Sequence, residues 1–279
     1  MIRLDESASG SSPEFDPKSI MRFLERSQRG GSAADKAQDL FYEAMDAPSE
    51  EAEFDLLEQA LNIDPGNVDA LLAMMQRHLP PLPPEQEIEA LKNIVRLGEK
   101  SLGKKAFEKY AGGFWGFIET RPYMRARAQL ALAFYQAGRV EEAMSEWEGM
   151  LELNPNDNQG MRYRLLALYL SLGRLKEARG LFKKYPEANF SAVFAWGKVL
   201  ERFLSGKLEA AATAAAAAHK LNGYAKAYIL GHRRIPKNMP ESYSPGSKEE
   251  AACYAEDLRL AWEPHREAVA WLAGWSGKA

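Results

Sequence analysis

Residues 136–143 read Gln136-Ala137-Gly138-Arg139-Val140-Glu141-Glu142-Ala143, and the pattern returns as Ser171-Leu172-Gly173-Arg174-Leu175-Lys176-Glu177-Ala178. The two glycines are 35 residues apart, and a looser copy around Gly206 follows 33 residues later. In each copy an apolar run ends at the glycine, which tolerates the left-handed conformation that commonly ends a helix. A new helix is expected within a few residues, so the chain repeats a pair of helices.

The residues around these glycines follow a helical spacing. Apolar side chains at i, i+1, i+4 and i+5 precede each glycine, which is typical of the buried stripe of an amphipathic helix. They are Leu130, Ala131, Phe134 and Tyr135 in the first copy, and Leu165, Leu166, Tyr169 and Leu170 in the second. The second helix of the first pair is expected to end at Asn154-Pro155, because proline cannot continue a helix interior.

The spacing resembles the consensus of the tetratricopeptide repeat, whose period is about 34 residues. The residues that carry this resemblance are Leu130, Ala131, Phe134, Gly138, Ala143, Trp147 and Pro155. Residues 159–186 resemble the same consensus, and residues 37–65 fit it once more. The resemblance implies an all-α fold, namely a tetratricopeptide-like α-solenoid in which antiparallel helix pairs form a right-handed superhelix with a divergent C-terminal cap.

Four segments are expected along the chain. Residues 1–33 form a tail in which Ile20, Met21, Phe23 and Leu24 favour a short helix, and 34–119 form N-terminal helical repeats with a non-standard unit from about 67. Residues 120–221 hold the tetratricopeptide-like repeats, and 222–279 form the cap. Pro80–Pro84 is interpreted as a connector between helices rather than a polyproline ligand. Ser247-Lys248-Glu249-Glu250 predicts a capping box within the cap.

Composition favours a soluble cytoplasmic protein. The 279 residues are 46% hydrophobic and 27% charged, with a formal net charge of −3, so nucleic acid is not the expected main partner. The single cysteine, Cys253, excludes an intrachain disulfide and suits a reducing compartment. Residues 1–20 have no apolar signal core, and no apolar run is long enough to span a membrane.

No set of residues predicts catalysis, a metal or a cofactor. Nucleophilic catalysis needs a nucleophile, a base and an orienting group together, and no such set emerges. The four histidines His78, His219, His232 and His265 are scattered without an i, i+4 pair. Cys253 is interpreted as a small core residue. We therefore expect a non-catalytic protein.

The register of the repeat predicts a binding groove on the concave face of the superhelix. One repeat would contribute Arg125, Ala128, Leu132, Tyr135 and Gln136, and the next Tyr163, Arg164, Ala167 and Leu170. Such a groove suits an extended or helical peptide with an acidic group. The alternative is that a C-terminal segment of the chain fills the groove. Leu132 stands where tetratricopeptide proteins that clamp a terminal carboxylate have an asparagine, which argues against that use.

Two further stretches are candidates for binding. The basic turn, residues 232–237, contains Arg233, Arg234 and Lys237. The turn predicts a site for RNA or for a phosphate ligand. The alternative is a solvated loop whose arginines pair with nearby helix ends. The aromatic stretch 107–123 is expected to be core, although an exposed Trp115 or Tyr123 would form a recognition hot spot.

A second resemblance covers roughly residues 115–272. Glu119-Thr120-Arg121-Pro122-Tyr123-Met124-Arg125 is similar to a segment of the suppression-of-tumorigenicity-seven family. The order Tyr228-Ile229-Leu230-Gly231, Pro240, Gly246, Glu250-Ala251 and Tyr254 is similar as well. Bacterial relatives without the membrane segments of the animal members look closer. The resemblance implies a helical-repeat scaffold without established chemistry and leaves the oligomeric state open.

Overall fold

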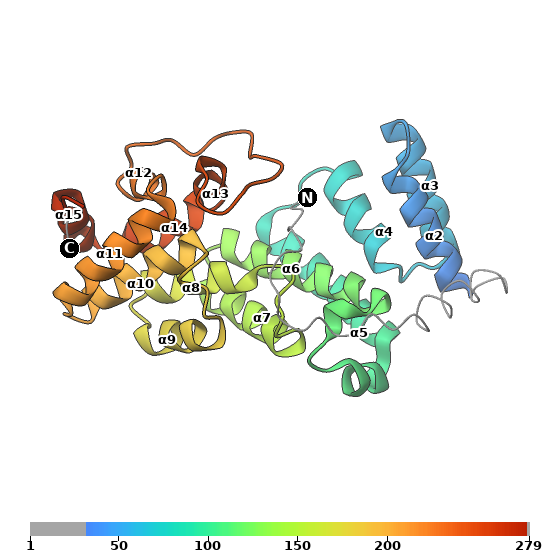
Figure 1. Cartoon of the computed structure of the whole chain (residues 1–279). Coiled ribbons are helices and arrows are strands. Elements are labelled where there is room, and N and C mark those ends of the chain that lie inside the picture. Colours follow the sequence, from blue (N-terminus) through green and yellow to red (C-terminus); the bar gives the residue numbers. More distant parts are fainter. Residues whose placement is uncertain (1–31, 278–279) are drawn as a thin grey trace. The chain divides into compact units, whose positions relative to one another are not determined.

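The computed structural model describes residues 32–277, and every regular element in that range is a helix (Figure 1). The expected all-α class is confirmed. The described residues divide into two compact units, 32–159 and 160–277. The division therefore falls inside the segment 120–221 that the repeat pattern treats as continuous. The helix expected through Ile20–Leu24 lies outside the described residues.

The first unit, residues 32–159, packs as neighbouring helix pairs. The pairs α2 with α3, α5 with α6, and α6 with α7 are in contact. The helices are α2 (Ala33–Met45), α3 (Glu50–Ile63), α4 (Val68–Ala73), α5 (Pro84–Tyr110), α6 (Arg121–Gln136) and α7 (Val140–Leu153), with a π-helical turn η1 (Met74–His78) and 3-10 turns η2 (Phe114–Gly116) and η3 (Ile118–Thr120). The prolines before α5 connect η1 to that helix, as expected.

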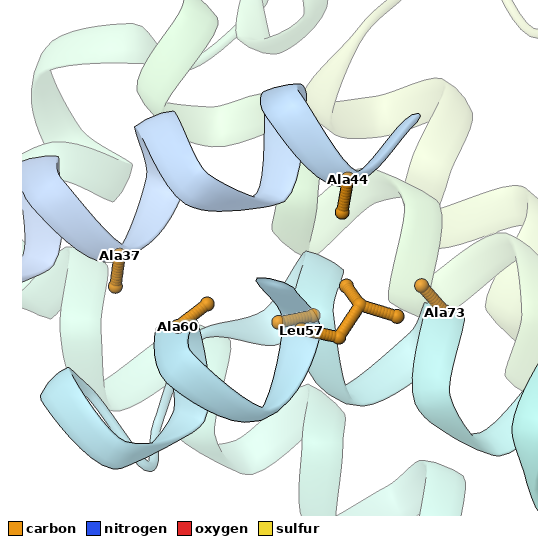
Figure 2. Close-up of a cluster of buried hydrophobic side chains, with 6 residues drawn as sticks. Ala37, Ala44, Leu57, Ala60 and Ala73 are labelled. Atoms are coloured by element: carbon orange, nitrogen blue, oxygen red, sulfur yellow. The ribbon is translucent and has the colours of Figure 1, made fainter. Parts of the chain in front are cut away.

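Small side chains let α2, α3 and α4 approach closely. Ala37 and Ala44 of α2 face Leu57 and Ala60 of α3, with Ala73 of α4 beside them (Figure 2). The first four of these residues are at most 1% exposed. Alanine is a strong helix former and needs little space, so this sequence favours both the helices and their close contact.

The second unit, residues 160–277, contains two helix pairs and a cap. Its elements are α8 (Met161–Ser171), α9 (Leu175–Lys184), α10 (Ala192–Leu204), α11 (Leu208–Asn222), α12 (Ala225–Ile229), α13 (Lys248–Cys253), α14 (Ala255–Trp262) and α15 (Arg266–Gly274). The pairs are α8 with α9 and α10 with α11. Helix α14 packs against α8, α10 and α12, so the expected cap folds back on the repeat helices.

The glycines end their helices as the sequence predicts. Gly138, Gly173 and Gly206 have φ of 75°, 68° and 73°, a conformation that glycine adopts without the clash of a Cβ atom. Each follows α6, α8 or α10 directly after its C-terminal turn. Helix α7 ends at Leu153, immediately before Asn154-Pro155. Among the described residues, no helix is both long and apolar enough to span a bilayer.

Only one of the two hydrogen bonds of the capping box predicted at Ser247 is present. Ser247 Oγ accepts a bond from the Glu250 amide at 3.1 Å, as a cap should. The Glu250 carboxylate does not return to Ser247. It accepts from the Ala192 amide (2.9 Å), from Asn222 Nδ2 (2.9 Å) and from the Gly246 amide (2.6 Å). These bonds connect α13 to the start of α10 and to the end of α11. The carboxylate that accepts them belongs to a residue that is only 2% exposed.

Candidate functional site

One face of α6 carries the residues that the repeat register assigns to the groove. Ala128, Leu132 and Gln136 follow one another at four-residue spacing, which places them on one side of a helix. The buried residues Leu130 and Phe134 lie on the opposite side of the helix. Leu132 is 38% exposed, although a leucine usually lies inside. We call Ala128, Leu132, Tyr135 and Gln136 the α6 face.

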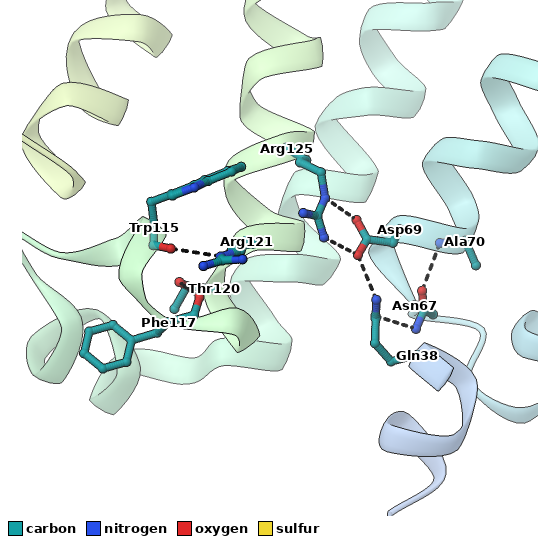
Figure 3. Close-up of polar contacts among 9 residues, drawn as sticks. All are labelled: Gln38, Asn67, Asp69, Ala70, Trp115, Phe117, Thr120, Arg121 and Arg125. Atoms are coloured by element: carbon teal, nitrogen blue, oxygen red, sulfur yellow. Dashed lines mark hydrogen bonds and ion pairs between the residues drawn. The ribbon is translucent and has the colours of Figure 1, made fainter. Parts of the chain in front are cut away.

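Arg125, at the N-terminal end of this face, is neutralised by the chain. Its Nε donates to Asp69 Oδ1 at 2.7 Å and its Nη2 donates to Asp69 Oδ2 (Figure 3). Gln38 Nε2 donates to the same carboxylate at 2.9 Å. Asp69 is 2% exposed, so the pair holds α2, α4 and α6 together. A positive charge that is already paired attracts an acidic ligand weakly, which removes one argument for an acidic group on the partner.

The aromatic stretch 107–123 is core only in part, because Phe117 is 38% exposed. Phe114 is fully buried and Tyr123 is 6% exposed, so Tyr123 is not the exposed hot spot that the sequence allowed. Trp115 remains half-exposed. Its carbonyl accepts a bond from Arg121 Nε at 2.9 Å, and the Arg121 guanidinium lies 5.6 Å from its ring centroid (Figure 3).

The α8 residues predicted for the same groove are covered by the chain itself. Ala167 and Leu170 are at most 1% exposed. Arg164 Nε lies 3.0 Å from Asp257 Oδ1, and its Nη2 lies 3.6 Å from Glu256 Oε2. Both carboxylates belong to α14, which packs against α8. The expectation that this part of the groove is open was therefore wrong, and the alternative of a C-terminal segment filling it describes α8.

Tyr163 is engaged by the chain itself, through hydrogen bonds of its hydroxyl and through a ring contact with the cap. Its hydroxyl donates to Glu187 Oε2 at 2.9 Å and accepts from Arg162 Nη2 at 2.7 Å. Its ring centroid lies 4.9 Å from that of Tyr254, whose hydroxyl is 2.7 Å from the Tyr243 hydroxyl. Burial raises the pKa of Tyr163 and of Tyr254. Tyr163 thus serves internal packing.

The basic turn is exposed. Arg233, Arg234 and Lys237 are all exposed, and among residues 32–277 none of the three forms an ion pair with a carboxylate. The Arg233 amide donates to the Ala227 carbonyl at 3.1 Å, and its guanidinium lies 5.7 Å from the Tyr228 ring centroid. The backbone of the turn is therefore anchored to α12, while the cations remain accessible.

The other reactive side chains are dispersed. Cys253 is half-buried rather than core, its Sγ lies 4.0 Å from the Pro240 carbonyl, and burial raises the pKa of its thiol. His265 Nε2 lies 2.8 Å from the Leu170 carbonyl. No group of three potential metal ligands occurs within residues 32–277. A hollow of about 520 Å³ on α5 is lined mainly by Arg96, Lys100, Lys104, Glu99 and Phe107.

Comparison with known families identifies a repeat in the middle of the chain. Residues 134–195 match the tetratricopeptide repeat family. The match runs from the end of α6 into α10 and includes the turns at Gly138 and Gly173. The chain therefore contains tetratricopeptide repeat sequence. No curated protein gives a significant match. The resemblance to the suppression-of-tumorigenicity-seven family stays a prediction.

Proposed function

We propose that this protein is a non-catalytic scaffold that binds a protein or peptide along the α6 face. The observation that carries the proposal is the exposure of Leu132 on the first helix of a helix pair that leads into the matched repeat. Tetratricopeptide repeats generally mediate protein–protein interactions, and an exposed apolar side chain flanked by polar ones is a common feature of such surfaces.

The proposed partner is an extended or helical segment that places an apolar side chain on Leu132 and polar groups near Gln136. Tyr135, which is half-buried against Trp147 with ring centroids 6.1 Å apart, would line the edge. An acidic group is not part of the proposal, because Arg125 and Arg164 are engaged by carboxylates of the chain. The cytoplasm is the proposed compartment, supported by the single cysteine.

The test uses peptides selected from a display library on the full chain. Their affinity is then measured for the wild type and for Leu132→Glu, which puts a charge in the centre of the α6 face. We expect at least a roughly tenfold loss of affinity, because a central apolar contact dominates such interfaces. The matched control is Leu208→Glu on α11, where the leucine is 53% exposed.

Retained binding by Leu208→Glu together with loss in Leu132→Glu supports the proposal. Equal affinity of the wild type and Leu132→Glu contradicts it. Circular dichroism of both variants separates a loss of binding from a loss of structure.

A further inference from the structure

The near-neutral net charge of the chain results from two units of opposite charge. Residues 32–159 contain 12 Lys and Arg against 23 Asp and Glu, a formal charge of −11. Residues 160–277 contain 18 against 11, a formal charge of +7. A charge imbalance of this size between parts of one chain creates fields that steer association with an oppositely charged surface.

In the positive unit, the basic turn concentrates accessible cations. Residues 232–239 include Arg233, Arg234 and Lys237 and no carboxylate. Met239, in the same loop, is 43% exposed, and Tyr224, just before α12, is 51% exposed. Cations without a carboxylate partner and exposed apolar side chains in the same segment of the chain suit an acidic partner that also carries apolar groups.

In the negative unit, the α2–α3 pair has the complementary character. Residues 33–63 contain nine Asp and Glu and one lysine. Of these ten charged residues, only Glu53 forms an ion pair with another described residue. Glu51, Asp55 and Glu58 follow one helical face and are exposed, an arrangement in which like charges destabilise the helix. Tyr42 (41%) and Phe54 (37%) are exposed among these carboxylates.

We propose that the basic turn is a docking site for the α2–α3 pair of a second copy of this chain. The two surfaces differ from each other, so the contact is head-to-tail and either closes into a ring or continues as a chain of molecules. Opposite charge, together with exposed apolar residues on both surfaces, is what selects this partner. The contact is separate from the α6 face and does not involve Leu132.

Sedimentation velocity of the full chain at increasing protein concentration tests the proposal. We expect concentration-dependent association at about 0.01 M salt that is lost at about 1 M salt, since the screening length falls from about 30 Å to about 3 Å. Reversing the turn with Arg233→Glu, Arg234→Glu and Lys237→Glu is expected to raise the dissociation constant at least about tenfold.

The matched control reverses three exposed lysines elsewhere in the same unit. Lys176→Glu, Lys198→Glu and Lys207→Glu change the net charge by the same amount and are expected to leave association close to that of the wild type. A second variant, Glu51→Lys with Asp55→Lys and Glu58→Lys, is expected to dissociate as the reversed turn does. Mixing it with the reversed-turn variant should restore association, because each then presents a charge opposite to that of the other.

Several results would overturn the proposal. One is a wild-type chain that stays monomeric at low salt. Another is a salt-sensitive compaction that does not depend on protein concentration, because it indicates contact within one chain. Failure of the two variants to associate when mixed, or equal effects of the turn and control reversals, would do so too. A monomer whose turn binds mixed-sequence RNA would assign the turn to nucleic acid.

Discussion

Helices α6 and α8 occupy equivalent places in successive copies of the sequence pattern, yet only α6 keeps its predicted groove residues exposed. Leu132 and Ala167 are 35 residues apart, the spacing of the two glycine turns. Leu132 is 38% exposed, whereas Ala167 is 1% exposed. Helix α8 packs against α14 as well as α9 and α10, and its Arg164 pairs with Asp257 of α14. A repeat pattern therefore predicts helix pairs, while a segment far along the sequence decides which face remains free for a partner.

The largest expected effect comes from removing the main apolar side chain of the covering helix. Trp262 of α14 is fully buried, so Trp262→Ala should lower the free energy of unfolding by about 3–5 kcal/mol. Trp115→Ala removes a half-exposed indole near α6 and should cost only about 1 kcal/mol. Urea unfolding followed by circular dichroism measures both. Similar losses for the two variants would contradict the view that α14 is part of the core.

Glu250 should have the next largest effect, because it fastens the cap to α10 and α11. Glu250→Ala leaves the Ala192 amide and the Gly246 amide without their acceptor and removes one of the two bonds donated by Asn222 Nδ2. Buried donors without partners are costly, so we expect a loss of about 2–4 kcal/mol in the same unfolding experiment. The neighbouring Glu249, which is more exposed, serves as the control. Its change to alanine should stay within about 0.5 kcal/mol, and a larger effect there would refute this assignment.

A smaller loss is expected from Asp69→Ala, which removes the acceptor for Arg125 and Gln38. A fully buried pair broken on one side would cost more, but the Arg125 side chain is 35% exposed and water screens it. We therefore expect about 2 kcal/mol from thermal or urea unfolding. Asp39→Ala on the exposed side of α2 is the control, and equal losses for the two would show that the Asp69 network contributes little.

The smallest expected effect is a change in the pH dependence of stability. Burial raises the pKa of the Asp257 carboxyl, and Arg164 only partly opposes this. The folded state therefore holds a proton that the unfolded state loses above about pH 4, so this group lowers stability as pH rises through that range. Asp257→Asn should remove this decrease from the pH profile of the unfolding free energy. An unchanged slope would show that Asp257 does not titrate there.

Local sequence was enough to predict the helix pairs. The spacing of Leu130, Phe134 and Gly138 specifies a helix, its buried side and its end, because all three depend on residues within a few turns. The exposure of Leu132 also follows from that register. The partner of Arg125 could not be predicted, since Asp69 is 56 residues away and no local pattern links the two.

Local sequence could not predict that α14 packs against α8 either. Asp257 lies in the first turn of α14, where a carboxylate is favoured by the helix dipole, so local sequence gives no sign of a distant partner. Its contact with Arg164 depends on how the loop after α12 and helix α13 place α14. The same applies to Glu250, for which a capping box was the local explanation and a bond network between distant helices is the observed one.

Thiol labelling tests the contrast between α6 and α8 most directly. In a Cys253→Ser background, single cysteines are introduced as Leu132→Cys or Ala167→Cys, and their modification rates are compared in the folded protein and in urea. Leu132→Cys should react almost as fast in the folded as in the unfolded protein. Ala167→Cys should react at least about a hundredfold more slowly when folded, because labelling requires α8 to be uncovered. Equal protection of the two cysteines would contradict the contrast between an open α6 face and a covered α8.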